Sequence, residues 1–197
     1  MELGYRQGMR AFVRLSAITA AVLLMAGCYF DQPLTGHASK NLNTWLLGVW
    51  ESKDESGRVS RIMVTPANES RYLVQVAVPG KTPRTTKRYE FEAWSSKVGS
   101  SNFLTLRCIE GSGDVPTGAH VFAHFELLNQ NNVRIRGLQL ESAPSASSFE
   151  LRKEVREKLK AGTLYTDKMA DWRRVEEVTW GKDGESIPFA PVRNPTL

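Results

Sequence analysis

Apolar and polar side chains alternate along most of the chain between residues 46 and 140. The alternation is clearest over Arg71–Val78 and over Lys87–Trp94, where Tyr89 and Phe91 share one face and charged residues occupy the other. A repeat of two residues is typical of a β-strand with one buried face. Short segments rich in Gly, Pro, Asn and Ser separate these runs, as turns do.

The alternating runs and the breaks between them predict seven strands in this region: Leu46–Ser52, Val59–Thr65, Arg71–Val78, Lys87–Trp94, Asn102–Glu110, His120–Leu128 and Val133–Leu140. Many short strands at close spacing favour an antiparallel meander. The predicted fold is therefore mainly β. It is a small barrel or half-barrel of about seven or eight strands, with a helix packed outside.

The repeat then changes from two residues to about four. Ser147 and Glu150 form the pattern of a helix-capping box, and apolar residues recur every fourth position over Leu151–Leu159. We expect a helix near residues 148–161, ended by Gly162. Because its apolar stripe is narrow, this helix is expected on the outside of the sheet.

The chain after the helix is less regular. Asp167–Arg174 is predicted as a short helical turn, and Val175–Trp180 as a last strand. The single β domain then covers residues 45–180. Residues 181–197, with several prolines, are expected to form a surface tail.

A charged and then apolar segment begins the chain. Arg6, Arg10 and Arg14 precede the uncharged stretch Leu15–Met25, which has the length of a secretory signal and is too short to cross a bilayer. It runs into the sequence Leu24-Met25-Ala26-Gly27-Cys28, which resembles the lipobox of bacterial lipoproteins. An ordinary secretory signal and an uncleaved anchor are the alternatives.

The lipobox resemblance implies a location for the protein. Residues 1–27 would be removed as a signal peptide, and the thiol of Cys28 would carry lipid with acyl chains such as palmitate. Residues 28–44 would form a lipidated polar tether on a cell-envelope membrane. If the bacterium is Gram-negative, Tyr29 after the cysteine, instead of Asp, favours the periplasmic face of the outer membrane.

Charge and cysteine content agree with export. Residues 1–27 carry three Arg and one Glu, so their removal would lower the net charge from +5 to about +3. This small and scattered excess argues against nucleic-acid binding. With Cys28 lipidated, Cys108 would have no disulfide partner. No covalent group other than the lipid, and no cofactor, is expected.

Gly48-Val49-Trp50 opens the first predicted strand. It resembles the Gly-x-Trp signature of lipocalin-like barrels, in which the tryptophan packs at the closed end against a late-strand arginine and a short helical turn. The resemblance implies structural roles for Gly48 and Trp50 and makes Arg134 and Arg136 candidates for the stacking cation. In any small β fold we expect Trp50 to be buried.

The inner face of such a barrel would decide whether it binds a ligand. A barrel of about eight strands holds one small ligand or is filled by its own side chains. The candidate ligand-binding residues on the inward-facing positions are Tyr72, Val74, Tyr89, Phe91 and Phe125.

The sequence contains few residues whose pattern suggests catalysis or metal binding. His120 and His124 share one strand face, but four strand residues separate them by about 13 Å, too far to bind one metal ion. Cys108 shares a face with apolar residues, as a buried free cysteine does. No catalytic motif is present, so no catalytic or metal-binding residue is predicted.

Three functions follow in order of preference. The first is a non-enzymatic envelope lipoprotein that binds a small apolar or amphipathic ligand. The second is a structural or assembly lipoprotein that binds another envelope protein through its sheet surface, with an exposed apolar patch at Trp94, Phe103 and Phe122. The third is a hydrolase.

Overall fold

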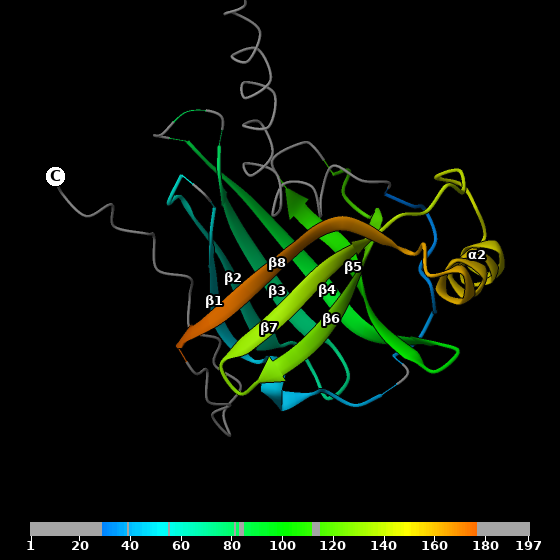
Figure 1. The fold of residues 1–197 in the computed structure, drawn as a ribbon, viewed down its shortest axis with the longest axis horizontal. Coiled ribbons are helices and arrows are strands. Elements are labelled where there is room, and N and C mark those ends of the chain that lie inside the picture. Colours follow the sequence, from blue (N-terminus) through cyan, green and yellow to red (C-terminus); the bar gives the residue numbers. More distant parts are fainter. Residues whose placement is uncertain are drawn as a thin grey trace, which may run out of the picture.

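The computed structural model describes residues 29–176, apart from residues 39, 55, 81, 83, 84 and 112–114. Eight antiparallel strands form a closed barrel in which each strand pairs with the next and the last pairs with the first (Figure 1). A short 3-10 helix, η1 (Thr44–Leu46), precedes the barrel. In the sequence, α2 (Ser148–Ala161) follows the seventh strand and precedes the eighth. The strands are β1 (Gly48–Lys53), β2 (Val59–Pro66), β3 (Tyr72–Pro79), β4 (Thr86–Val98), β5 (Ser101–Gly111), β6 (His120–Asn129), β7 (Asn132–Leu138) and β8 (Tyr165–Glu176).

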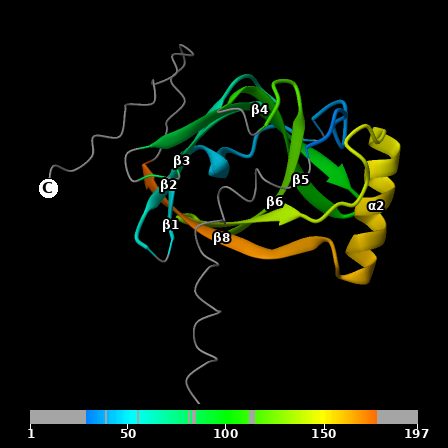
Figure 2. The same ribbon diagram turned by 90° about the horizontal axis from the view of Figure 1, so that it is seen from above.

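The predicted fold class is confirmed. The barrel is closed, and the helix packs outside it, beside β4 (Figure 2). The capping box of Ser147 and Glu150 is present, and Gly162 ends α2 in the left-handed conformation with φ 72°.

The prediction for the region after the helix was wrong. Residues 167–174 are not a helical turn but the middle of β8, which begins ten residues earlier than the predicted strand. In β8, Ala170 and Trp172 are buried while Met169 and Asp171 are exposed, a repeat of two residues. The barrel requires this strand, because β8 pairs with β7 on one side and with β1 on the other.

The barrel interior is the main hydrophobic core. Inward-facing residues from all eight strands meet there, together with Leu46 and Leu47 of the segment that crosses one end. Trp50 and Trp172, both at most 2 % exposed, are among the largest side chains in this core. Burial of so many apolar side chains is the main stabilising contribution to the closed sheet.

A second core lies outside the barrel. Phe103 and Phe122 project outward from β5 and β6, and α2 covers them with Leu151 and Val155. Phe30 completes this cluster by stacking on Phe122, with ring centroids 5.3 Å apart. The outer core therefore joins three parts of the chain that are distant in sequence.

Two apolar residues of the segment predicted as a tether are packed against the domain. Phe30 and Leu34 are at most 1 % exposed. Phe30 also exchanges two backbone hydrogen bonds with His120, of 2.9 and 2.8 Å. This packing could not be predicted from the sequence, because two isolated apolar residues in a polar segment form no periodic pattern.

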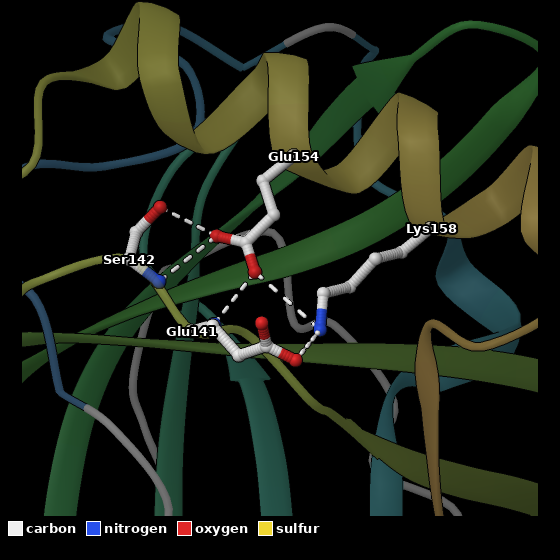
Figure 3. Close-up of polar contacts among 4 residues, drawn as sticks. All are labelled: Glu141, Ser142, Glu154 and Lys158. Atoms are coloured by element: carbon white, nitrogen blue, oxygen red, sulfur yellow. Dashed lines mark hydrogen bonds and ion pairs between the residues drawn. The ribbon is translucent and has the colours of Figure 1, made fainter.

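Polar contacts fix α2 to the strand connection before it. The Glu154 carboxylate accepts hydrogen bonds from the backbone N–H groups of Glu141 and Ser142 at 2.6 and 3.1 Å and from the Ser142 hydroxyl (Figure 3). Lys158 donates to the Glu141 carboxylate at 2.7 Å. Burial alone would raise the pKa of Glu154, but these hydrogen bonds and the charge of Lys158 outweigh it and lower the pKa.

Within the part of the chain that the structure describes, no helix has the length and apolar character needed to span a membrane. The proposed signal peptide, the lipid-bearing Cys28 and the tail at residues 181–197 lie outside the described residues.

Candidate ligand-binding site

The barrel encloses an apolar cavity of about 90 Å³. Side chains from all eight strands line it, with Leu46 of η1 at one end. An engineered apolar cavity of about 150 Å³ stays dry and binds benzene, whereas pockets for drug-sized ligands exceed about 300 Å³. The barrel is thus neither wholly filled nor wide, and its free space suits a small or narrow apolar group.

Four of the five candidate ligand-binding residues line this cavity. Tyr72 and Val74 reach it from β3, Phe91 from β4 and Phe125 from β6. The fifth, Tyr89, is only 3 % exposed and belongs to the same core, but it does not line the cavity. Tyr89 lies one inward position beyond Phe91, towards the end of the barrel away from η1, and its ring stacks on Phe91 at 6.2 Å.

Trp50 lies at the η1 end of the cavity. Its indole N–H donates to the Leu46 carbonyl at 2.9 Å, which fixes η1 across this end of the barrel. The Arg174 guanidinium lies over the indole ring, 4.7 Å from its centroid, and also donates to the Trp45 carbonyl. A buried tryptophan, a helical turn and an arginine of the last strand thus meet at this end of the barrel.

The arginine itself was predicted wrongly. Arg134 pairs instead with Asp171 through two hydrogen bonds of 2.8 and 3.0 Å on the outer surface, and Arg136 lies 5.5 Å over the Tyr165 ring. Arg174 was missed because its strand was expected to be a helical turn. The alternation of Ala170, Trp172 and Arg174 was the available signal.

A polar opening adjoins the apolar cavity. Its volume is about 170 Å³. It is lined by residues 40–43, which precede η1 and are called the pre-η1 segment, and by strands of the barrel wall. The lining residues are Lys40, Asn41, Asn43, Tyr72, Ser95, Asn102, His124 and Phe125. We call this space the vestibule. Because Tyr72 and Phe125 line both spaces, the vestibule and the cavity are adjacent.

The vestibule lies at the η1 end of the barrel. Odd-numbered strands begin at this end in an antiparallel barrel, and Tyr72 and Asn102 are the first and second residues of β3 and β5. The Tyr72 hydroxyl accepts a hydrogen bond of 2.6 Å from the Asn43 backbone N–H, which ties the pre-η1 segment to the barrel wall. Sequence reasoning missed the vestibule, since its polar residues come from segments that only the fold brings together.

Cys108 is buried in the core near the far end of the barrel from η1, with its Sγ 3.8 Å from the Val115 carbonyl oxygen. Burial raises the pKa of the Cys108 thiol. A nucleophilic cysteine needs the opposite shift, so the surroundings of Cys108 are those of a small apolar core residue.

The two strand histidines have separate surroundings on the outer face of β6. His120 packs edge-on against Trp94 at 6.0 Å, whereas His124 lies between Phe103 and Tyr165 at 5.7 and 5.1 Å. Burial is the main cause that lowers the pKa of each ring. Among the described residues, no three His, Cys, Asp or Glu side chains are grouped so that they could hold a metal ion.

The apolar patch expected for an assembly protein is not exposed. Trp94, Phe103 and Phe122 are at most 5 % exposed. The helix and the segment around Phe30 cover Phe103 and Phe122, and the indole N–H of Trp94 donates to the Thr35 carbonyl at 3.0 Å. The patch exists on the sheet, but the chain itself covers it.

Comparisons with protein-family models, with curated proteins and with solved structures found no match to this chain.

Proposed function

We propose that this protein is a lipid-anchored lipoprotein of the bacterial envelope whose lipocalin-like barrel binds a small apolar or amphipathic molecule without chemical conversion. The observation that carries the proposal is the apolar cavity of about 90 Å³ inside the closed barrel. Apolar cavities of this kind remain dry, so an apolar group gains favourable contacts on entering.

The size of the cavity limits the ligand. The cavity is smaller than the one of about 150 Å³ that binds benzene and far below the range of drug-sized pockets, so the buried part of the ligand is at most a single short chain or one ring. The lining of aromatic and branched aliphatic side chains provides apolar contact along the whole cavity. A large or strongly polar ligand is therefore excluded from the interior.

The packing of Phe30 supports attachment close to the membrane. Phe30 is fixed to β6, and only Tyr29 separates it from Cys28 in the sequence. Two residues reach about 7 Å, so a lipid on Cys28 would hold the barrel at the bilayer surface with almost no spacer. A ligand that partitions into the bilayer would then be close to the protein.

Native mass spectrometry of the protein extracted from its own membrane tests the anchor. We expect a chain that begins at Cys28 and carries the mass of the acyl chains, with a retained small molecule in part of the population. An unmodified chain that begins at Met1 would refute the lipoprotein assignment.

A cavity-filling substitution tests the binding. Ala123→Leu on β6 places a larger side chain in the cavity, since Ala123 lines it. With the lipidated protein held in a non-ionic amphipol, benzene or 1-hexanol should change the fluorescence of Trp50 and Trp172, and Ala123→Leu should weaken this binding at least about tenfold. The control Ala67→Leu, in the exposed loop between β2 and β3, should bind normally. Equal binding by both variants would place the ligand outside the barrel.

A further inference from the structure

We infer that the vestibule is the entrance to the barrel and the binding site for the head of a single-chain amphiphile, and that this head is anionic. The inference rests on the proposed function, because it assigns the polar end of the same ligand. The chemical class is a short alkyl chain that ends in a carboxylate or a phosphate.

The cavity and the vestibule differ in polarity. The cavity is lined almost wholly by apolar side chains, while the vestibule is lined mainly by polar residues. Tyr72 and Phe125 form the boundary between them. A molecule with an apolar chain and a polar head is the one ligand class that satisfies both spaces at once, because a buried polar head without partners is costly.

The vestibule provides the route into the cavity. The vestibule adjoins the cavity at the η1 end, beside the segment that crosses the barrel. Toward the opposite end, the core is occupied by Val78, Tyr89 and Cys108 from the strands and by Val115 and Ala119 from the loop before β6. The chain of the ligand would therefore enter past Tyr72 and Phe125 and leave its head in the vestibule.

The charge of the vestibule lining favours an anionic head. Among the residues that line the vestibule, Lys40 carries the only full charge expected at neutral pH, since the burial of His124 lowers its pKa and keeps it neutral. No carboxylate lines the vestibule. An anionic head is thus favoured over a cationic one by simple charge complementarity.

The side chain of Asn102 adds a polar group to the vestibule lining. Its side-chain Oδ1 is buried and accepts no hydrogen bond from any residue that the structure describes. Asn102 lines the vestibule, where its side-chain NH₂ group can donate to a carboxylate or phosphate oxygen. Ser95, also in the lining, offers a hydroxyl donor.

Three probes of equal chain length test the head group: hexanoate, 1-hexanol and hexylammonium. The lipidated protein in a non-ionic amphipol is titrated with each at pH 7.5, and the change in total tryptophan fluorescence, to which the cavity-lining Trp50 and Trp172 contribute, is the signal. Because Lys40 is exposed, the expected preference for hexanoate over 1-hexanol is modest, about three- to fivefold, and hexylammonium should bind weakest. The preference should decline as salt is added.

Two variants and one control make the test specific. Lys40→Gln should lower the ratio of hexanoate affinity to 1-hexanol affinity to within about twofold. Asn102→Leu should weaken the binding of hexanoate more than the binding of 1-hexanol. Lys53→Gln, an exposed lysine at the opposite end of β1, should retain the full preference.

The outcomes separate the two proposals. If none of the probes and no benzene binds, the barrel is not a binding site and both proposals fail. If 1-hexanol and benzene bind but the protein does not prefer hexanoate over 1-hexanol, the barrel binds ligands and only the head-group assignment is overturned. The same conclusion follows if Lys53→Gln and Lys40→Gln remove the preference to the same extent.

Discussion

The Arg174 guanidinium on β8 lies 4.7 Å from the centroid of the Trp50 ring on β1. This contact joins the first strand to the last at the point where the barrel closes. Arg174 is half-buried and the Trp50 ring is only 2 % exposed, so the contact should be worth between the 0.5–1 kcal/mol of exposed pairs and the about 2 kcal/mol of desolvated ones. Arg174 also donates to the Trp45 carbonyl, so one side chain secures both the strand closure and the segment that crosses the barrel end.

Replacing Arg174 should therefore destabilise the barrel more than replacing its neighbour. Arg174→Met keeps most of the side-chain length but removes the charge and the hydrogen bond. We expect a loss of about 1–2 kcal/mol in the free energy of unfolding, measured by urea denaturation. Arg173→Met, at an exposed position of the same strand, should change it by less than about 0.5 kcal/mol. Equal losses of unfolding free energy in the two variants would mean that the contact of Arg174 with Trp50 does not stabilise the barrel.

Phe30 is expected to hold the N-terminal segment on the barrel. Truncation of a buried Phe costs about 3–5 kcal/mol in a closed core, but here local detachment of the segment limits the cost. Phe30→Ala should accelerate hydrogen exchange at the His120 amide, which donates to the Phe30 carbonyl. It should also uncover Phe122 and increase binding of a hydrophobic dye.

Asp31→Ala is the matched control for this test, since the Asp31 side chain is exposed. It should leave the exchange rate of the His120 amide unchanged. If Phe30→Ala also leaves that rate unchanged, the segment is held by other contacts.

Glu154 is expected to stabilise the docking of α2 in a pH-dependent way. The carboxylate accepts three hydrogen bonds from Glu141 and Ser142, so Glu154→Ala should cost about 1–3 kcal/mol at pH 7. The folded-state pKa of Glu154 lies below its ordinary value of about 4.5. Its contribution is therefore fully present above pH 4.5 and is lost as the pH falls through the folded-state pKa.

Thermal unfolding of wild type and Glu154→Ala between pH 7 and pH 3 measures this effect. The two melting temperatures should approach each other at the acidic end. Glu157→Ala, an exposed position on the same helix, should follow the wild type throughout. A difference between wild type and Glu154→Ala that stays constant with pH would assign the effect to packing alone.

The buried histidines should make the protein less stable in mild acid. The pKa values of His120 and His124 both lie below the ordinary value near 6.5, chiefly because of burial, with the charge of Arg107 lowering the first and that of Arg136 the second. Below about pH 6.5 the unfolded chain binds more protons than the folded one, so stability decreases as the pH falls towards the folded-state values. A decline in melting temperature between pH 8 and pH 5.5 is the expected result.

Substitution assigns the decline to these residues. The double variant His120→Gln and His124→Gln should flatten the melting temperature over this pH range, whatever its absolute stability. His37→Gln, at an exposed position, should keep the wild-type slope. An unchanged slope in the double variant would assign the pH dependence to other groups.

The sequence determined those features that arise from local chemistry. The strands up to β7 are predicted by alternation, and the helix and its ends by the capping box at Ser147 and the glycine at position 162. These signals are readable because each depends on residues only two to four positions apart. The inward positions of Tyr72 and Phe91 follow from the same rule.

The tertiary structure alone decided which distant residues meet. Barrel closure turned residues 165–176 into a strand, since β7 and β1 each needed a partner, and this closure placed Arg174 over Trp50 instead of Arg134 or Arg136. Packing also buried Phe30 on Phe122 and brought Lys40 together with Asn102 beside the cavity. The physical reason is the same in each case: the free energy of these contacts comes from pairs that are far apart in the chain, and no local pattern records them.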